Sequence, residues 1–430
     1  MQPNEFDLGP YPDDTGYAEA LHLDQQDELA SFRDRFASAE PDLIYLDGNS
    51  LGKPPLDGLT AINRVAEQEW RKQLIRSWPA GWWRLPVSIG NQLAPLIGAG
   101  RDEVVIADST SVALYKLALG AMRAAPGRLR IVTDDMNFPT DNYVLAAVAE
   151  QAGAEVVTIR SGGVPYGPTD AIIASLDSQT ALLSLSHVAF KSGYLYDMEK
   201  LTSAAHRVGA KVLWDLSHSV GAVPIDVEAA AVDLAVGCTY KYLNGGPGSP
   251  AFLYASGKRA ADIENPVPGW WGHQEPFAFE LDHRPAPSVR RFQTGTMPIL
   301  SLTPVQQGVA LTVDAGMDRI RSKSIALSEF FIKLALQRLS PLGFELASPR
   351  ESAQRGSHVS LQHDDAWRIV QGMAEVARII PDFREPSNIR FGFAPLYTSF
   401  LDIHTAIGRV AALVSGGSHE GYSAQRRVVT

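Results

Sequence analysis

Between residues 100 and 255, short runs of β-branched and apolar residues alternate with segments of helical periodicity. This alternation is typical of an α/β fold with a mostly parallel sheet, because each parallel connection needs a long crossover that is usually a helix. We expect a seven-stranded sheet, with strands at residues 103–107, 129–133, 155–159, 181–186, 211–215, 234–239 and 251–254. We expect the intervening helices at residues 110–122, 141–152, 169–176 and 197–208.

The two ends of the chain do not follow this alternation. The first 80 residues begin rich in Asp and Pro and then become helical at 56–74. A long helical pattern at 305–339 leads to strand-like runs at 343–346 and 389–393. We therefore predict three parts, namely an N-terminal segment (1–80) packed with the small domain, a large domain (81–305) and a small α+β domain (306–430).

The bulk composition limits the class of partner. The chain is 45% hydrophobic and 20% charged, with a net charge of −10 and a pI near 5.5. This acidity disfavours nucleic acid and anionic membranes, which need clustered Lys and Arg. We find no signal-peptide pattern and no uncharged apolar run of about 18 residues. Together with a single cysteine, Cys238, this predicts a cytoplasmic protein.

Two reactive side chains stand at the ends of neighbouring predicted strands. Tyr240 and Lys241 follow an apolar run and open into a glycine-rich loop at 245–248, and Asp215 ends another apolar run. Pyridoxal 5'-phosphate (PLP) needs this pair, since a lysine forms its Schiff base and a carboxylate keeps its pyridinium nitrogen protonated. Tyr240 could donate to the cofactor phosphate or transfer protons, or it could be an amphipathic residue at the rim.

Two other strand ends carry polar residues suited to the same cofactor. Ser109 and Thr110 lie where a strand meets a helix, and a helix N-terminus attracts phosphate, although the same residues also make a good N-cap. After the next strand, Phe138 could stack on a flat ring with Pro139, Thr140 and Asp141 beside it. A proline turn followed by an Asp cap explains this second run equally well.

Further polar and aromatic residues remain open to two interpretations. His218 is a cofactor contact or a hydrogen-bonding neighbour, and Arg390 is a clamp for a substrate α-carboxylate or half of a buried ion pair. The tryptophans near Trp78 and Trp270 form either core or an aromatic substrate pocket. No metal site is predicted, because the chain has no His-Glu-x-x-His motif and one cysteine. Glycine-rich nucleotide motifs are also absent from the sequence.

Several longer motifs match one family. They are the runs at 45–52, 215–219, 240–248, 269–273 and 390–397, which together span most of the chain. On these motifs the chain closely resembles kynureninases, which are PLP-dependent enzymes of the fold type I transferase class related to aminotransferases and cysteine desulfurases. The resemblance implies hydrolytic β,γ C–C cleavage of L-kynurenine to anthranilate and L-alanine. It places the chain in tryptophan catabolism, and in NAD biosynthesis where the pathway serves it.

The resemblance also implies roles for individual residues. Lys241 matches the Schiff-base lysine, Asp215 the pyridinium partner and Phe138 the stacking residue. Tyr240 matches a contact to the cofactor phosphate, and it is also our candidate for proton transfer late in the reaction. Other matches near the cofactor are Ser109, Thr110, Asp141, Ser186 and His218. Arg390 corresponds to the carboxylate-binding arginine, with Ser50 and Trp78 near the substrate. Trp270 and Thr296 match residues that the other subunit of a homodimer contributes.

Some alternatives stay open at this level. Animal members carry His and Asn where this chain has Trp78 and Thr296, so it resembles the bacterial type, which prefers kynurenine over 3-hydroxykynurenine. An aminotransferase shares the early chemical steps, and a keto-acid-dependent half reaction would identify one. A cysteine desulfurase needs a mobile thiol, whereas Cys238 lies on an apolar strand. A PLP-fold regulator would need a basic helix-turn-helix module, for which the acidic N-terminal segment leaves no room.

Overall fold

The computed structural model describes residues 15–37, 40, 42–163 and 165–425, so residues 1–14 of the predicted N-terminal segment lie outside the described residues. The large domain is built on a seven-stranded sheet in the order β2-β8-β7-β6-β5-β3-β4. Among these strands, β8 runs in one direction and the other six run in the opposite direction. This arrangement confirms the predicted mostly parallel sheet. The strands are β2 (Val104–Ile106), β3 (Arg130–Asp134), β4 (Glu155–Ile159), β5 (Thr180–Ser186), β6 (Lys211–Asp215), β7 (Leu234–Gly237) and β8 (Phe252–Ala255).

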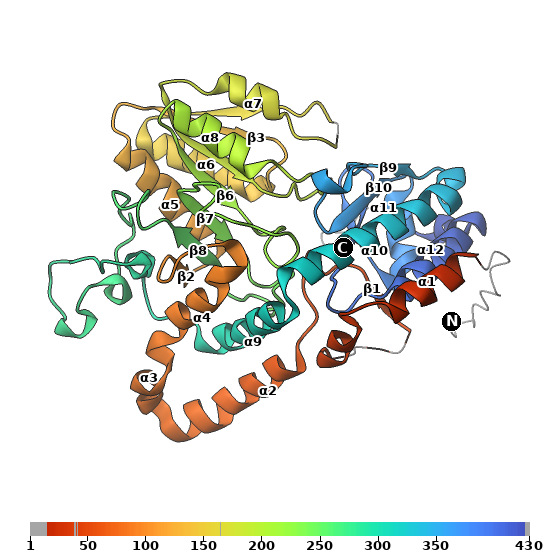
Figure 1. The fold of residues 1–430 in the computed structure, drawn as a ribbon, viewed down its shortest axis with the longest axis horizontal. Helices are drawn as coiled ribbons and strands as arrows, with labels where there is room; N and C mark the ends of the chain where they lie inside the picture. The colour runs from red at the N-terminus through yellow and green to blue at the C-terminus, as the bar shows by residue number, and fades with distance from the viewer. Residues whose placement is uncertain (1–14, 38–39, 41, 164, 426–430) are drawn as a thin grey trace.

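Helices cover both faces of this sheet, as Figure 1 shows. Helix α5 (Thr110–Ala124) packs on α6 (Pro139–Ala152), while α7 (Thr169–Ser175) packs on α8 (Met198–Arg207). Local capping sets two of the starts, because Ser109 accepts from Val112 N at 3.4 Å and Asp197 accepts from Lys200 N at 2.9 Å. Each helix therefore begins just beyond the carboxyl end of a strand or a short loop.

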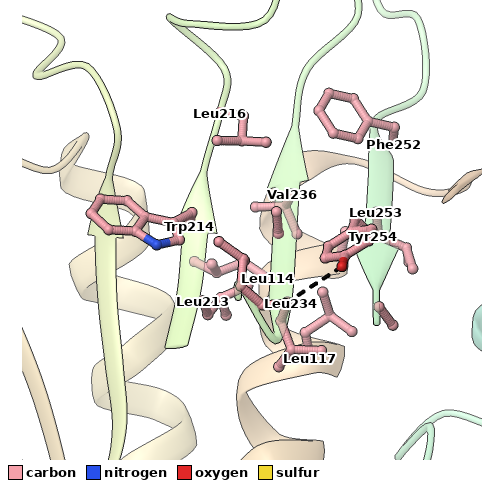
Figure 2. Packing of buried hydrophobic residues seen from close by; sticks show 14 of the residues in the cluster. Leu114, Leu117, Leu213, Trp214, Leu216, Leu234, Val236, Phe252, Leu253 and Tyr254 are labelled. Atoms are coloured by element: carbon pink, nitrogen blue, oxygen red, sulfur yellow. Dashed lines mark hydrogen bonds between the residues drawn. The ribbon is translucent and has the colours of Figure 1, made fainter. Parts of the chain in front are cut away.

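The core of the large domain lies between the sheet and its helices (Figure 2). Leu114 and Leu117 of α5 point toward Leu213, Leu234 and other apolar side chains of the central strands. Every residue of β5 and β7 is buried, since helices cover the sheet on both sides. This explains why the central strands appear in the sequence as continuous apolar runs.

The small domain has its own sheet and its own apolar core. Its four-stranded antiparallel sheet has the order β12-β13-β10-β9, and a parallel pair β1-β11 lies beside it. These strands are β1 (Ile44–Tyr45), β9 (Glu345–Leu346), β10 (His358–Gln362), β11 (Ile379–Ile380), β12 (Asp382–Arg384) and β13 (Asn388–Gly392). The helices are α1 (Thr15–Gln25), α10 (Met317–Arg338), α11 (Ala366–Glu375) and α12 (Phe400–Ser415). Because α1 packs on α12 and β1 pairs with β11, the start of the described chain joins this core.

The segments between the two cores correct one prediction. The helical pattern at 305–339 is two helices, α9 (Ile299–Ala315) and α10, separated at Gly316. Gly316 has a φ of +78°, a left-handed conformation that ends α9 and favours glycine. Helix α2 (Leu56–Arg64) packs along α9 and continues as a π-helical stretch, Val65–Gln73, toward α3 (Ser77–Ala80) and α4 (Leu85–Leu93). The boundaries at 80/81 and 305/306 stay predictions.

None of the helices in the described ranges is both long and apolar enough to cross a membrane. The long helix α10 carries charged residues along its length, and α9 spans 17 residues with a proline inside. Both helices bury most of their apolar side chains within the protein.

Two glycines on packed helices give a matched test of this arrangement. A Cβ at Gly308 of α9 would lie 1.9 Å from the Leu243 carbonyl oxygen, whereas one at Gly58 of α2 would lie 3.5 Å from Pro304 Cβ. We expect Gly308→Ala to lower the free energy of unfolding by about 1–3 kcal/mol through overpacking. Gly58→Ala should instead raise it by about 0.5–1 kcal/mol, because alanine favours the helix. Urea denaturation measures the free energy of unfolding of both variants. Equal changes in the two would contradict the close approach of α9 to the loop that contains Leu243.

Candidate active site

Reactive side chains meet at one edge of the large sheet, where its parallel strands end. Asp215 ends β6, and Ser186 at the end of β5 lies opposite it in the strand register. Lys241 follows β7, Phe138 precedes α6, and Ser109 caps α5. Open α/β sheets bind ligands along this edge because helix N-termini and loops gather there. The structure therefore brings together most of the residues that the sequence singled out.

Lys241 is tied to a neutral histidine. Its Nζ lies 2.9 Å from His218 Nε2, and His218 is buried. Burial, followed by the positive charge of Lys241, holds the pKa of His218 well below its ordinary value. The neutral ring thus accepts from Lys241 at Nε2 and carries its proton on Nδ1, which has no protein partner among the described residues. One buried donor is left for a ligand.

Asp215 is a buried carboxylate held by a short network. Its Oδ1 accepts from Ser217 N at 2.9 Å and from Ser217 Oγ at 2.6 Å. Burial raises the pKa of Asp215, and nearby Lys241 lowers it. Asp141 shares a hydrogen bond with Asp215, and burial followed by the charge of Asp215 raises the pKa of Asp141 well above its ordinary value. We infer that Asp141 keeps its proton and donates it to an ionised Asp215.

Tyr240 stands beside the chain's one cysteine. Cys238, followed by burial, raises the pKa of the Tyr240 phenol above its ordinary value, and the two side chains share a hydrogen bond. Tyr240 therefore remains a donor throughout the neutral range. Cys238 is 1% exposed and its backbone N–H donates to Ser217 Oγ at 3.0 Å. A thiol fixed in this way is unsuited to the mobile role that a desulfurase requires.

A buried ion pair that the sequence did not reveal supports the start of α5. Lys116 of α5 is fully buried and donates to Asp108 and to the Phe292 carbonyl oxygen. Thr294 Oγ1 also donates to Asp108, at 3.1 Å. Asp108 itself has a φ of +52° and directs the chain into Ser109. The start of α5 is thus fastened to the segment before Thr296.

A second polar cluster lies around Arg390 in the small domain. Arg390 Nη2 donates to Ser50 Oγ at 2.8 Å and to Asp382, and Nη1 donates to the Phe190 carbonyl oxygen at 2.5 Å. The Phe190 ring meets Phe138 edge to face, with centroids 5.4 Å apart. Arg390 is therefore linked to the residue that begins α6 on the large domain.

The chain segment around Ser50 connects the two domains at this point. Gly52 N donates to the Tyr240 carbonyl oxygen at 2.7 Å, and Gly392 N donates to the Leu46 carbonyl oxygen at 2.6 Å. A Cβ at Gly52 would lie 2.4 Å from the Lys241 carbonyl oxygen. This close approach brings Ser50 between the Lys241 loop and Arg390, so that the two polar clusters face one site.

Trp78, Trp270 and Thr296 lie apart from Lys241 within one chain. They line a cavity of about 950 Å³ together with Trp83 and Phe277. Trp78 meets Trp271 edge to face, with ring centroids 5.3 Å apart, so part of this aromatic group is core. Trp270 and Phe277 are 40% and 63% exposed. Among the described residues, Lys241 does not line this cavity, and no hydrogen bond, ion pair or ring contact joins it to Trp78, Trp270 or Thr296.

The arrangement suits PLP on observations made in the protein itself. Asp215 is a buried carboxylate that needs a cationic partner, and a pyridinium nitrogen is one. His218 Nδ1 offers an unpaired donor, and the first turn of α5 offers backbone N–H groups for a phosphate. Phe138 is 42% exposed and available for stacking. The residues predicted from the sequence to contact the cofactor are Ser109, Thr110, Phe138, Pro139, Thr140, Asp141, Ser186, Asp215, His218, Tyr240 and Lys241.

Sequence reasoning missed three charged residues beside Arg390. Asp382 and Arg384 lie on β12, and Asp47 comes just after β1. Asp382 is the register partner of Arg390 on the neighbouring antiparallel strand, which places the two side chains on one face. The alternation of Asp382, Phe383 and Arg384 is a strand pattern with charges on one face. Its partner strand is not apparent from sequence alone.

The inferred proton on Asp141 can be tested without any ligand. An amide at this position can still donate to Asp215, so we expect Asp141→Asn to change the free energy of unfolding by less than about 1 kcal/mol. Asp141→Ala leaves Asp215 short of a donor and should cost about 1–3 kcal/mol. Denaturant titration of the ligand-free variants at neutral pH provides the comparison. If Asn proves as costly as Ala, Asp141 is ionised.

Comparison with known proteins identifies relatives over most of the chain. Residues 320–410 match the family described as the kynureninase C-terminal domain. A kynureninase from Pseudomonas fluorescens is 43% identical over 394 residues, which cover 90% of this chain and 93% of the relative. A kynureninase from Burkholderia mallei is 44% identical over 396 residues with the same coverage of both chains.

Solved structures agree at the level of the fold. A cysteine desulfurase from Escherichia coli superposes with a TM-score of 0.76 at 17% identity, covering 89% of this chain and 97% of the other. A cysteine desulfurase from Thermococcus onnurineus also gives 0.76, at 19% identity and with 92% and 98% coverage. These likenesses confirm the predicted fold type I architecture, and the much higher identity to the curated relatives places this chain in the kynureninase family.

Proposed function

We propose that this chain is a PLP-dependent hydrolase that uses water to cleave L-kynurenine into anthranilate and L-alanine, and that 3-hydroxykynurenine is a second substrate. The observation that carries the proposal is the Lys241 and Asp215 pair at the sheet edge, in a chain 43% identical to a kynureninase. The reaction breaks the bond between the β-carbon and the ketone carbon of the substrate. Water supplies the oxygen that leaves in anthranilate.

The protein holds the cofactor through residues at three strand ends. When bound, PLP supplies an electrophilic carbon for amines and a ring that accepts electrons from the substrate. Ser109, Thr110 and Tyr240 bind its phosphate, and Phe138 stacks on its ring. Asp215 keeps the ring nitrogen protonated, because a buried carboxylate is stabilised by a cation beside it. Asp141 supports Asp215 by donating its proton.

Lys241 and Tyr240 divide the work of proton transfer. We assign to Lys241 Nζ the removal of the proton from the substrate α-carbon, because a lysine amine is a compact base on a flexible side chain. Lys241 would then release this proton to a carbon of the cofactor. The neutral ring of His218 accepts from the amine and therefore does not compete for the proton. Tyr240 keeps its phenolic proton at neutral pH, so we assign it the proton delivered late in the reaction, when the C–C bond breaks.

Different residues recognise the two ends of the substrate. Arg390 binds the α-carboxylate, with Ser50 beside it. Trp78 lies near the aromatic ring of the substrate, a role that its cavity, rich in tryptophan, suits well. From the resemblance to the bacterial type at Trp78 and Thr296, we infer that the chain prefers kynurenine over 3-hydroxykynurenine.

We further propose that the functional unit is a homodimer whose active sites are shared. Trp270 and Thr296 line a cavity that does not contact Lys241 of the same chain. Exposed apolar residues surround this cavity, including Ile75 at 75% and Phe279 at 74% exposure. An exposed patch of this kind favours a protein partner, and a second copy would bring Trp270 and Thr296 to the neighbouring cofactor site.

The proposed reaction predicts two products in equal amounts. PLP-loaded protein incubated with L-kynurenine should release anthranilate, followed by its fluorescence, and one alanine for each anthranilate. Lys241→Ala should lower the rate by at least about 10³-fold, because the general base is lost. Alanine release that depends on an added keto acid would instead indicate an aminotransferase.

The shared site predicts complementation between two defective subunits. Lys241→Ala and Trp270→Ala should each be impaired as pure dimers. A mixed dimer would contain one site with both residues intact, so random mixing should restore about one quarter of the parent activity. If Trp270 serves its own chain, mixing restores nothing. Tagging the two variants differently and purifying the mixed dimer separates these outcomes.

A further inference from the structure

Four ionisable groups meet at the Arg390 site, and we call Asp47, Asp382, Arg384 and Arg390 the arginine cluster. Asp382 and Arg390 are 2% and 1% exposed and form a buried ion pair. The same Asp382 oxygen, Oδ2, lies 2.7 Å from Arg384 Nη2 and accepts from Ser50 Oγ at 3.0 Å. One carboxylate thus bridges two guanidinium groups in a site that excludes most water.

The bridging position of Asp382 creates a charge problem for Arg390. A guanidinium paired with one carboxylate is neutral as a unit, and a neutral unit gives a substrate carboxylate little net attraction. Arg384 changes this balance, because two guanidinium groups and one ionised Asp382 leave a net charge of +1 when Asp47 is protonated. Burial, followed by the charge of Arg390, lowers the pKa of Arg384, so the two cations sense one another.

We propose that Arg384 is a positioning residue for substrate carboxylate binding: it neutralises Asp382 so that Arg390 keeps a free positive charge for the carboxylate. The proposal deepens the proposed function and rests on Arg390 as the carboxylate site. Arg384 acts through Asp382 rather than by contact with substrate. Its Nη2 is engaged by Asp382 and its Nη1 donates to the Phe383 carbonyl oxygen at 3.1 Å.

The position of Arg384 fits this role. Its side chain is 29% exposed and lines a cleft of about 1000 Å³ between the two domains, together with Phe138 and Phe190. The Phe190 carbonyl oxygen in turn accepts a hydrogen bond from Arg390 Nη1. The charge of Arg384 therefore lies at the wall of this cleft, which the proposed ring-stacking residue Phe138 also lines.

Asp47 sets the pH range in which the cluster stays positive. Burial, followed by the charge of Asp382, raises the pKa of Asp47 to about 6, and its Oδ1 has no protein partner among the described residues. The groups that face it are Ser50, Asp382, Arg384, Arg390 and the phenols of Tyr45, Tyr242 and Tyr397. Above about pH 6, Asp47 ionises and the net charge of the cluster falls from +1 to 0. Carboxylate affinity should therefore weaken as pH rises through this value.

The decisive experiment compares ligands with and without a carboxylate on the holoenzyme. L-kynurenine and L-alanine carry the carboxylate, whereas kynuramine and ethylamine are the matched amines without it. We expect Arg384→Met to raise KM for L-kynurenine and Kd for L-alanine about ten-fold or more, since the charge balance at a short buried distance is lost. The value of kcat should change little, and the affinities for the two amines should stay as in the parent.

Two variants act as controls. Arg384→Lys restores the charge and should recover most of the affinity. Arg368→Met removes the same charge from α11, where Arg368 pairs with Asp365 at 3.5 Å. It should leave the affinities for both amino acids and both amines unchanged. Equal weakening of amino acids and amines, or no weakening by Arg384→Met, overturns the proposal. Calorimetric binding of L-alanine needs no turnover, so failure of the kynurenine reaction would be seen separately from failure of the cluster.

Asp47→Asn provides a readout that remains if Arg384→Met does not fold. In the parent, the ratio of L-alanine to ethylamine affinity should fall between pH 5.5 and pH 7.5, because only the carboxylate responds to the charge of Asp47. The amide cannot ionise, so the cluster stays positive and the ratio should become flat across this range. An unchanged slope in Asp47→Asn overturns the role given to this cluster.

Discussion

The buried carboxylate of Asp215 is the interaction on which the rest of the active site depends. Placing a charge at the end of a fully covered strand is costly, and the protein offsets the cost with local donors. Ser217 gives two hydrogen bonds and Asp141 gives a third, while Lys241 lies close enough to lower the carboxyl pKa. Ser217, Asp141 and Lys241 come from three different segments, namely the loop after β6, the start of α6 and the loop after β7. Their convergence requires the parallel sheet.

The segment from Leu46 to Gly52 connects these active-site residues to the small domain. It continues β1, which belongs to the small-domain core, and then crosses to donate from Gly52 to Tyr240. There is no space for side chains at Gly52 or Gly392, where a Cβ would lie 2.3 Å from Asn244 Oδ1 and 1.8 Å from Asn49 Oδ1, respectively. Ser50 is therefore held between the Lys241 loop and Arg390. The two halves of the proposed site are set at a fixed separation by backbone contact, not by long flexible side chains.

The sequence predicts the sheet well because its strands are buried on both faces and so appear as apolar runs. The Lys241 and Asp215 positions follow from the same logic, since reactive residues at the ends of such runs must share one edge. Two features could not be predicted in this way. The pairing of Asp382 with Arg390 depends on the register between β12 and β13, and the burial of Lys116 depends on contact with Phe292, far along the chain. The helical pattern at 305–339 did not reveal the break between α9 and α10, because the sequence does not show that Gly316 adopts a positive φ.

Two neutral imidazole rings lie between the buried carboxylate of the large domain and the arginine cluster. The carboxylate of Asp215 lies on the large domain, and the arginine cluster lies on the small domain. Between them, the rings of His218 and His358 lie 5.6 Å apart. Burial, followed by nearby cations, holds the pKa of both histidines well below its ordinary value, so neither adds a further positive charge. A zwitterionic amino acid needs this arrangement, because its carboxylate must find a cation while its amine stays reactive beside Lys241. If either histidine were charged, it would compete with Arg390 for the carboxylate.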